Sequence, residues 1–157
     1  MKISKPLYNQ EQRAKRDATI WTLVQGILAP IQFLVCLISL SLVLRYLITG
    51  DGYTAATISV VIKTIFLYLI MLTGSIWEKV VFGKYLFAES FFWEDVFSML
   101  VITLHTLYLY FLFAGNMSQR GLMYLALAAY IAYFINAGQF IYKLRMARLQ
   151  MGEGVAV

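Results

Sequence analysis

The chain has few of the residues on which protein-held metal and redox sites depend. Its 157 residues include one cysteine, one histidine and two prolines, and charged residues make up 13%. The single cysteine, Cys36, has no partner for a disulfide or a thiolate metal site, and the single histidine, His105, cannot form a bis-histidine haem site within one chain. The sequence also lacks an HExxH motif, a Gly-rich phosphate loop and a Ser-His-Asp spacing. Redox catalysis by a metal held in the protein is therefore not expected.

Apolar residues dominate the composition instead. Hydrophobic residues account for 61% of the chain and the mean hydropathy is +0.74, too high for a soluble domain of this length. A helix needs about 20 mainly apolar residues to cross roughly 30 Å of hydrocarbon. Four stretches meet this requirement, at about 21–48, 54–76, 91–113 and 122–142.

These stretches have the pattern of helices rather than of barrel strands. Strands of a membrane barrel alternate apolar and polar residues, and the runs 38–44 and 122–135 do not. We therefore predict an all-α integral membrane protein, a four-transmembrane-helix bundle, with residues 1–157 as a single membrane domain. The first twenty residues are polar and charged, so no cleaved signal peptide is expected.

Basic residues indicate the orientation of the bundle. Ten lie next to the same ends of the predicted spans: Lys2, Lys5, Arg13, Lys15, Arg16, Lys79, Lys84, Lys143, Arg145 and Arg148. The other side has only Arg45 and Arg120. The positive-inside rule then predicts that both termini and the middle connection are cytoplasmic. An anionic leaflet explains the net charge of +5, so no nucleic-acid partner is expected.

Two ionisable residues are predicted deep inside the spans, where such groups are costly and mark a functional site by default. Lys63 is nine residues from the outer end of its span and His105 is eight from the outer end of its own. At about 1.5 Å per residue both lie roughly 12 to 14 Å deep, so we expect them to be neighbours. Lys63 is too deep to reach the outer surface, so it needs a partner, a cavity or the loss of a proton.

A second set of polar residues is predicted in the cytoplasmic half. It comprises Gln25, Glu78, Glu94, Asp95, Asn136 and Gln139, while Ser98 shares a face with Glu94 and Gln32 continues the polar stripe of the first span. Trp77 and Trp93 are expected near headgroup depth. Structural interpretations are also open: the acids complement a helix dipole or are interfacial charges, and the amides hold helices together. His105 can likewise be satisfied by a hydroxyl or a carbonyl.

Four long strings of residues point to a family: YNQEQRAKRD (8–17), WTLVQGILAPIQFLV (21–35), TGSIWEKVVFGKYLFAESFFWEDVFSMLV (73–101) and LHTLYL (104–109). Together they resemble the 3-vinyl (bacterio)chlorophyllide hydratases of bacteriochlorophyll biosynthesis, over about residues 8–148. The resemblance implies a hydratase that adds water to the 3-vinyl group of chlorophyllide a or bacteriochlorophyllide, giving the 3-(1-hydroxyethyl) derivative. It also implies a multi-pass protein of the bacterial inner, photosynthetic membrane, with other bacteriochlorophyll-synthesis enzymes as candidate partners.

That reaction needs an acid for the vinyl group and a base for water, and neighbouring carboxyl groups in a partly dry site can supply both. Glu94 and Asp95 are the first candidates, with Glu78 as the alternate acid. Substrate contacts are expected from Gln25, Gln32, Lys63, Trp77, Trp93, Ser98, His105, Asn136 and Gln139. The tetrapyrrole substrate brings its own magnesium, for which His105 is a candidate axial ligand, so no separate cofactor is expected. The alternative is a non-enzymatic membrane protein that binds or assembles pigment through His105.

Overall fold

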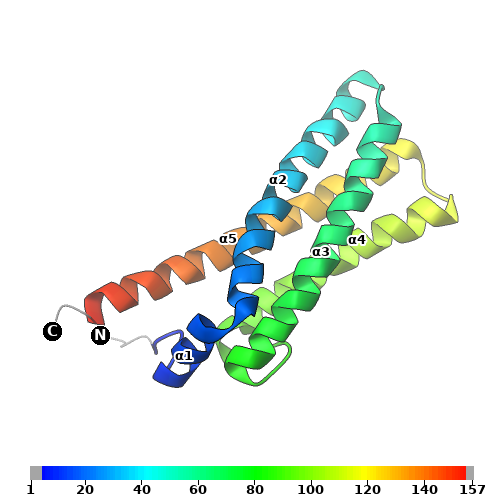
Figure 1. Cartoon of the computed structure of the whole chain (residues 1–157). Coiled ribbons are helices and arrows are strands. Elements are labelled where there is room, and N and C mark those ends of the chain that lie inside the picture. Colours follow the sequence, from blue (N-terminus) through cyan, green and yellow to red (C-terminus); the bar gives the residue numbers. More distant parts are fainter. Residues whose placement is uncertain (1–4, 155–157) are drawn as a thin grey trace.

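The computed structural model describes residues 5–154, with side chains described for residues 5–152. Its helices are α1 (Gln10–Ala18), α2 (Ile20–Thr49), α3 (Tyr53–Phe82), α4 (Phe92–Ala114) and α5 (Gln119–Gly154), with the short 3-10 helix η1 (Glu89–Phe91) before α4 (Figure 1). By length and composition, α2 to α5 can each cross a membrane. The predicted all-α architecture with four spanning helices is confirmed at this level.

Left-handed glycines end three of the long helices, α2, α3 and α4. α2 ends at Gly50, with φ of 79°, and the Gly50 amide donates a hydrogen bond to the Tyr46 carbonyl at 2.7 Å. α3 ends in the same way at Gly83, with φ of 84°, whose amide donates to the Lys79 carbonyl at 3.0 Å. Glycine adopts this conformation without the steric cost that a Cβ atom imposes. The chain therefore reverses within residues 50–52 after α2 and over residues 83–91 after α3.

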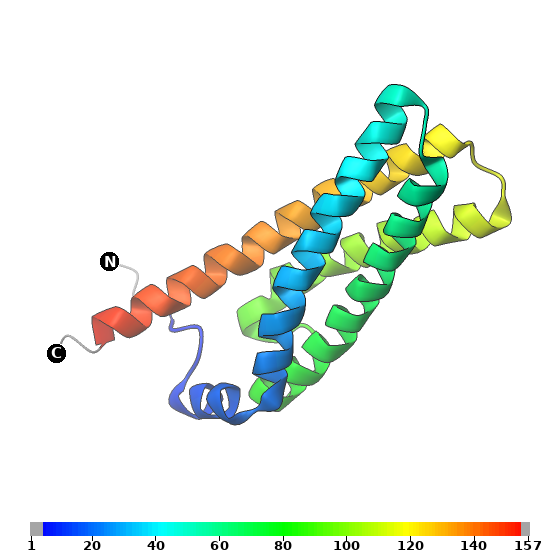
Figure 2. The same cartoon turned by 45° about the horizontal axis from the view of Figure 1, so that its top comes forward.

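The four long helices form two antiparallel hairpins, α2 with α3 and α4 with α5 (Figures 1 and 2). The hairpins cross, so that α2 contacts α5 and α3 contacts α4. Beyond the crossing, the C-terminal half of α5 diverges from the N-terminal half of α2 in both views. Small residues of α5, Ala126 and Ala129, are fully buried in the shared core, where they let the helices approach closely.

The outward faces of the long helices are apolar. Large exposed side chains on them include Ile27, Leu34, Ile38, Ile48, Ile58, Ile65, Leu72, Phe113, Ile131 and Ile135. An apolar surface that extends over four helices is unfavourable in water and is covered by lipid in a bilayer. Because a helix satisfies its own backbone hydrogen bonds, these faces suit a lipid bilayer.

One end of the bundle is packed by the N-terminal segment. An aromatic group, here called the end cluster, comprises Leu7, Tyr8, Trp77, Val81, Phe82, Phe91, Phe140 and Ala147. The Tyr8 ring stacks on that of Phe82 with centroids 5.7 Å apart, and the Arg16 guanidinium lies 4.8 Å from the Tyr8 centroid. The N-terminal segment, the α3–α4 connection and the C-terminal part of α5 therefore meet at the same end.

Some boundaries differ from those that the sequence predicted. α3 continues from residue 76 to Phe82 and α5 from residue 142 to Gly154. Helix α1 was not predicted; it begins with a reciprocal cap between Asn9 and Gln12. Pro30 lies inside α2 without ending it. Lys2, counted above among the basic residues, lies outside the described part of the chain.

Candidate functional site

Polar side chains gather at two levels inside the bundle. The first group, the carboxyl cluster, lies beside the α3–α4 connection and comprises Glu78, Glu94, Asp95, Ser98, Asn136, Gln139 and Lys143. The second, the mid-span cluster, lies where the hairpins cross and comprises Cys36, Ser39, Lys63, His105, Tyr130 and Tyr133. Asp95 and His105 are ten residues apart on α4, or about 15 Å along its axis, which separates the two levels.

The carboxyl groups of Glu78 on α3 and Asp95 on α4 contact each other. Both side chains are buried, with 4% and 5% of their surface exposed. Each also accepts a backbone hydrogen bond: Glu78 Oε1 from the Ala88 amide at 2.6 Å and Asp95 Oδ2 from the Phe87 amide at 2.9 Å. Two carboxylates in contact repel each other unless a proton lies between them. The pair is therefore suited to hold one proton.

The same two hydrogen bonds hold the connection between α3 and α4. Phe87 has a φ of 61°, the only positive value at a non-glycine residue among the described ones. That conformation is uncommon for a residue with a Cβ atom and persists only when the surroundings stabilise it. The bonds from Phe87 and Ala88 to the two carboxyl groups supply such stabilisation, so the pair also positions the start of α4.

Glu94 faces a different partner from its neighbour Asp95. Its Oε2 accepts a hydrogen bond from Lys143 Nζ on α5 at 2.9 Å, and the two side chains form an ion pair. The Glu94 side chain is 10% exposed and the Lys143 side chain is 29% exposed. Lys143 Nζ also donates to the Ser90 carbonyl. Adjacent helical residues point about 100° apart, and here that difference directs Asp95 to α3 and Glu94 to α5.

Ser98 and Asn136 connect α4 to α5, and Gln139 binds Asn136 within α5. Ser98 Oγ donates to Asn136 Oδ1 at 2.9 Å, and Asn136 Nδ2 donates to the Glu94 carbonyl at 3.0 Å and to Gln139 Oε1 at 3.2 Å. Hydrogen bonds between helices stabilise membrane bundles, which was the structural interpretation of Asn136 and Gln139; the structure shows such bonds for Asn136. They also place a polar group one turn deeper than the Glu94 carboxylate.

In the mid-span cluster, Lys63 and His105 are both fully buried. The Lys63 ammonium lies 3.8 Å from the centroid of the Tyr133 ring, and the His105 ring lies 5.8 Å from that of Tyr130. His105 Nδ1 is 2.8 Å from the Val101 carbonyl, which can only accept, so Nδ1 carries the hydrogen and Nε2 has the lone pair in the neutral ring. Within the described chain, Lys63 Nζ and His105 Nε2 have no hydrogen-bond partner. Lys63 also interacts electrostatically with His105, so the structure brings the two together.

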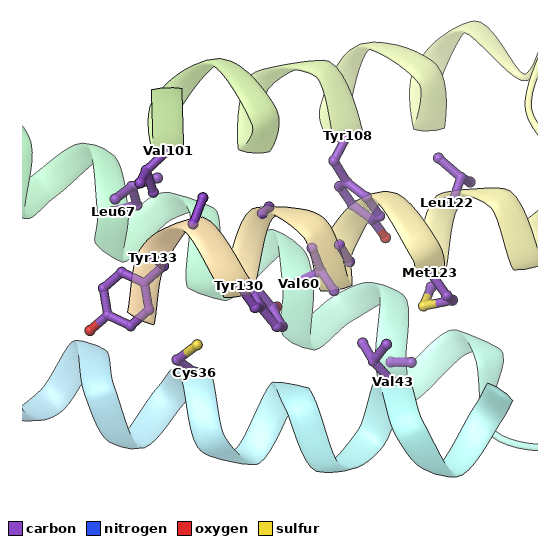
Figure 3. Close-up of a cluster of buried hydrophobic side chains, with 14 of the residues drawn as sticks. Cys36, Val43, Val60, Leu67, Val101, Tyr108, Leu122, Met123, Tyr130 and Tyr133 are labelled. Carbon is purple, nitrogen blue, oxygen red and sulfur yellow. The ribbon is translucent and has the colours of Figure 1, made fainter. Parts of the chain in front are cut away.

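Hydroxyl groups continue this cluster toward α2. Tyr130 and Ser39 are hydrogen-bonded at 2.5 Å, and Ser39 is hydrogen-bonded to Ser59 of α3 at 2.7 Å. Figure 3 shows Tyr130 and Tyr133 projecting from α5 toward α2, where Cys36 is directed at them. The crossing of the hairpins is therefore lined by polar groups from all four long helices.

Other residues predicted to contact substrate lie outside these clusters. Gln25 Nε2 donates to Thr73 Oγ1 at 2.6 Å, and Trp77 Nε1 donates to Thr22 Oγ1 at 2.9 Å, so both join α2 to α3. Gln32 is buried, and its Oε1 has no partner in the described structure. Trp93 is 71% exposed and packs on Phe92. Trp93 is therefore available to lipid or to a ligand on the outer face of α4.

Sequence reasoning missed three residues of the two clusters, Lys143, Tyr130 and Tyr133. Lys143 was counted only as a basic residue after the fourth span, although it follows Asn136 by seven residues, two helical turns, and so shares its face. Tyr130 and Tyr133 were not singled out, because a tyrosine among many aromatic residues has no distinctive spacing. Periodicity could have found Lys143, whereas only packing identifies the two tyrosines.

A small cavity lies at the end of the bundle, next to Lys143. Its volume is about 140 Å³, and its lining comprises Lys5, Leu7, Lys143, Met146, Ala147 and Gln150. This volume accommodates a few water molecules but not a tetrapyrrole. Lys143 is the one residue that this lining shares with the carboxyl cluster, and its ammonium binds Glu94.

A resident metal would find few ligands here. Among the residues that the structure describes, no three or more histidine, cysteine, aspartate or glutamate side chains gather as metal ligands. His105 Nε2 is a single unpartnered nitrogen, which fits the axial position of a metal that a macrocycle already holds.

Comparison with known proteins places the chain in a family. The family model described as 2-vinyl bacteriochlorophyllide hydratase (BCHF) matches residues 8–146. A 2-vinyl bacteriochlorophyllide hydratase from Cereibacter sphaeroides is 70% identical over 146 residues, which cover 92% of this chain and 90% of the relative. Another, from Rhodobacter capsulatus, is 66% identical over 146 residues, covering 93% of this chain and 85% of the relative. No solved structure matches the chain.

Proposed function

The chain belongs to the 2-vinyl bacteriochlorophyllide hydratase family, and we propose that it adds water across the vinyl group of a chlorophyllide-type macrocycle in bacteriochlorophyll synthesis. The 2-vinyl of this name and the 3-vinyl of the resemblance above are the same substituent in two numbering schemes. The product has a 1-hydroxyethyl group in place of the vinyl group. The single observation that carries the proposal beyond the family is the contact between the Glu78 and Asp95 carboxyl groups.

The reaction begins with proton transfer to carbon. The π electrons of the vinyl group take a proton at the terminal carbon, which leaves a cation on the carbon next to the ring, where the conjugated macrocycle delocalises it. The oxygen of water then bonds to that inner carbon, and a base takes the excess proton. The protein must therefore supply one acid, one base and a negative charge near the cation.

The carboxyl cluster supports an assignment of these roles. The Glu78–Asp95 pair holds the proton that the vinyl group receives, and regains one from the attacking water, so it ends the cycle unchanged. Glu94, ion-paired with Lys143, provides the negative charge beside the developing cation. Ser98, Asn136 and Gln139 orient the attacking water, which enters past Lys143. Glu94 and Asp95 were the first candidates for the acid; the contact between Asp95 and Glu78 favours Asp95 and gives Glu78 an equal part.

The remaining candidate residues bind the macrocycle in this proposal. His105 ligates the substrate magnesium through Nε2, or anchors a ring carbonyl, and Lys63 lies near it. Gln25, Gln32, Trp77 and Trp93 contact the edges of the pigment. The protein uses no cofactor of its own, binds no nucleic acid, and works beside other enzymes of bacteriochlorophyll synthesis.

The proposed setting is the inner, photosynthetic membrane of the bacterium, with residues 1–157 as one multi-pass domain. Both termini and the α3–α4 connection face the cytoplasm, because the basic residues concentrate at that end. The cavity beside Lys143 then opens toward the cytoplasm, which supplies the water.

Turnover tests the function directly. The purified full chain in lipid nanodiscs is incubated with a vinyl chlorophyllide, and the products are followed by absorption and mass spectrometry. We expect a blue shift of the red absorption band, because a vinyl group leaves conjugation, together with a mass gain of one water. Glu78→Gln/Asp95→Asn protein is the matched control. Tight pigment binding without any mass gain would instead support the pigment-binding alternative.

A further inference from the structure

The Lys63 ammonium is a buried cation without an acceptor. Lys63 is fully buried, its Nζ has no hydrogen-bond partner, and none of the ion pairs found in residues 5–152 includes it. An ammonium has three donors and no acceptor, so it needs oxygen atoms or a negative charge in a dry interior. In a membrane protein, an ionisable group left in this way is a functional-site candidate.

The groups around Lys63 do not provide that charge. The Tyr133 ring of α5 lies against the ammonium, and Cys36 of α2 and His105 of α4 are close enough to interact with it electrostatically. A phenol, a thiol and an imidazole carry no negative charge near neutral pH. The π face of Tyr133 attracts a cation but accepts no full hydrogen bond.

Three other lysines of the described chain do have acceptors. Lys143 binds the Glu94 carboxylate at 2.9 Å, Lys15 binds that of Glu11 at 2.7 Å, and Lys79 donates to the Gly83 carbonyl at 2.9 Å. Lys63 is the deepest of these lysines in the bundle and the one whose acceptor is missing. A bound ligand can therefore supply the acceptor that the Lys63 ammonium lacks.

The substrate of the proposed function carries the matching group. A chlorophyllide is the free acid of its macrocycle, so it bears an ionised propionate, while its vinyl, ketone and ring groups are uncharged. We propose that Lys63 binds the propionate carboxylate of the tetrapyrrole, which takes the place of the Tyr133 ring beside the ammonium. This assignment rests on the proposed function and specifies which form of the pigment the site selects.

The distance between the two clusters agrees with this assignment. Tyr133, against which Lys63 lies, and Lys143, which binds Glu94, are ten residues apart on α5, or roughly 15 Å. Asp95 and His105 give the same spacing on α4, roughly 15 Å. The propionate and the vinyl group lie on different rings of the macrocycle, a separation of comparable size. One substrate can thus reach Lys63 with its carboxylate and the carboxyl cluster with its vinyl group.

The test compares two ligands that differ only in charge. Vinyl chlorophyllide and its propionate methyl ester share the macrocycle, the magnesium and the vinyl group. Binding of each to the wild-type chain in nanodiscs is measured by fluorescence quenching in the presence of matched lipid. We expect the acid to bind at least about tenfold more tightly than the ester, because a dry ion pair forms only with the acid. Equal affinities in the wild-type protein would overturn the inference without any variant.

Variants then assign the discrimination to one residue. Lys63→Met should reduce the acid-to-ester ratio to about one, whereas Lys79→Met, the same change at an exposed position of α3, should leave it unchanged. Lys143→Met tests the rival cation beside the end cavity. If Lys143→Met abolishes the discrimination and Lys63→Met retains it, the carboxylate binds at Lys143 and the inference is wrong. The acid-to-ester affinity ratio is measured within each variant. A variant that binds both ligands more weakly therefore keeps its ratio and does not mimic the expected result.

Turnover separates this inference from the proposed function. Mass gain of one water on either ligand, with equal affinity for acid and ester, would overturn the role of Lys63 and leave the hydratase function standing. Discrimination that depends on Lys63, without hydration of either ligand, would overturn the hydratase function and leave the carboxylate site.

Discussion

The Asp95 carboxyl group on α4 contacts the Glu78 carboxyl group on α3, and residues 83–91 connect these two helices. The backbone amides of Phe87 and Ala88 bind the same two groups, so both acids are held in place before substrate arrives. A preorganised pair that shares one proton is a reasonable donor to carbon, because no reorganisation is needed at the moment of transfer.

Removing the acidity of this pair should stop the chemistry and spare the fold. In Glu78→Gln or Asp95→Asn the remaining amide oxygen still accepts its backbone hydrogen bond. We expect kcat to fall by about 10² to 10⁴ with pigment affinity largely preserved. Steady-state kinetics and a binding titration measure the two effects.

Glu89→Gln is the matched control for these variants. Glu89 is a neighbouring carboxylate whose side chain is 87% exposed, so its loss should not change kcat. The wild-type enzyme should also show a solvent deuterium isotope effect, since proton transfer to carbon is expected to limit the step. Normal turnover in both amide variants would mean that the Glu78–Asp95 pair has only a structural role, in which it holds the α3–α4 connection.

Glu94 and Lys143 should depend on each other for stability. Lys143→Met leaves the Glu94 carboxylate nearly buried without its cation, so we expect a loss of about 1.5–3 kcal/mol in the free energy of unfolding. The double variant Lys143→Met/Glu94→Gln should recover part of that loss. Denaturant unfolding of the four proteins of this cycle in detergent gives the coupling energy. Strict additivity of the single variants would show that the ion pair contributes nothing.

His105 should act on affinity more than on the chemical step. If its Nε2 ligates the substrate magnesium, His105→Ala should raise KM and leave kcat within a few fold. Added imidazole should then restore affinity, because it can occupy the space that the ring leaves. A fall in kcat at unchanged pigment affinity would assign His105 to proton transfer instead.

Lys63 should reduce the stability of the empty protein. Because its ammonium is buried without an acceptor, Lys63→Met should raise the free energy of unfolding by about 1–3 kcal/mol or leave it unchanged. Thermal unfolding of the ligand-free chain in detergent measures this, with Lys79→Met as the exposed control. A large drop in stability would mean that the ammonium itself holds the bundle together.

The orientation of the bundle can be tested at two positions. Ten basic residues at one end against two at the other predict a cytoplasmic C-terminus and an outer turn at Gly115. A phosphatase reporter fused after Gly115 should be active, and the same reporter at the C-terminus should be inactive. If the reporter is active at both positions or inactive at both, the two positions lie on the same side, which would contradict a four-span topology.

The sequence by itself determined the four helices and the depth of their polar residues. Mainly apolar stretches long enough to cross a bilayer, without the alternation of barrel strands, form helices, because lipid offers no partner for backbone polar groups. The fixed rise per residue then places Lys63 and His105 at similar depth, and the structure brings them into one cluster. Outside the bilayer these constraints weaken, which is why α1 and the extension of α5 to Gly154 were not anticipated.

Only the tertiary structure decided which polar groups meet. Glu94 and Asp95 are adjacent in sequence and equally deep, yet one pairs with Lys143 of α5 and the other with Glu78 of α3. Their 100° difference in direction is local, but the partner found in each direction depends on how the two hairpins cross. The missing acceptor of Lys63 is likewise a property of packing, since Tyr133 reaches it only from the other hairpin. Helix formation follows from local hydrogen bonding and apolar length, whereas the pairing of side chains follows from crossing geometry that no single helix encodes.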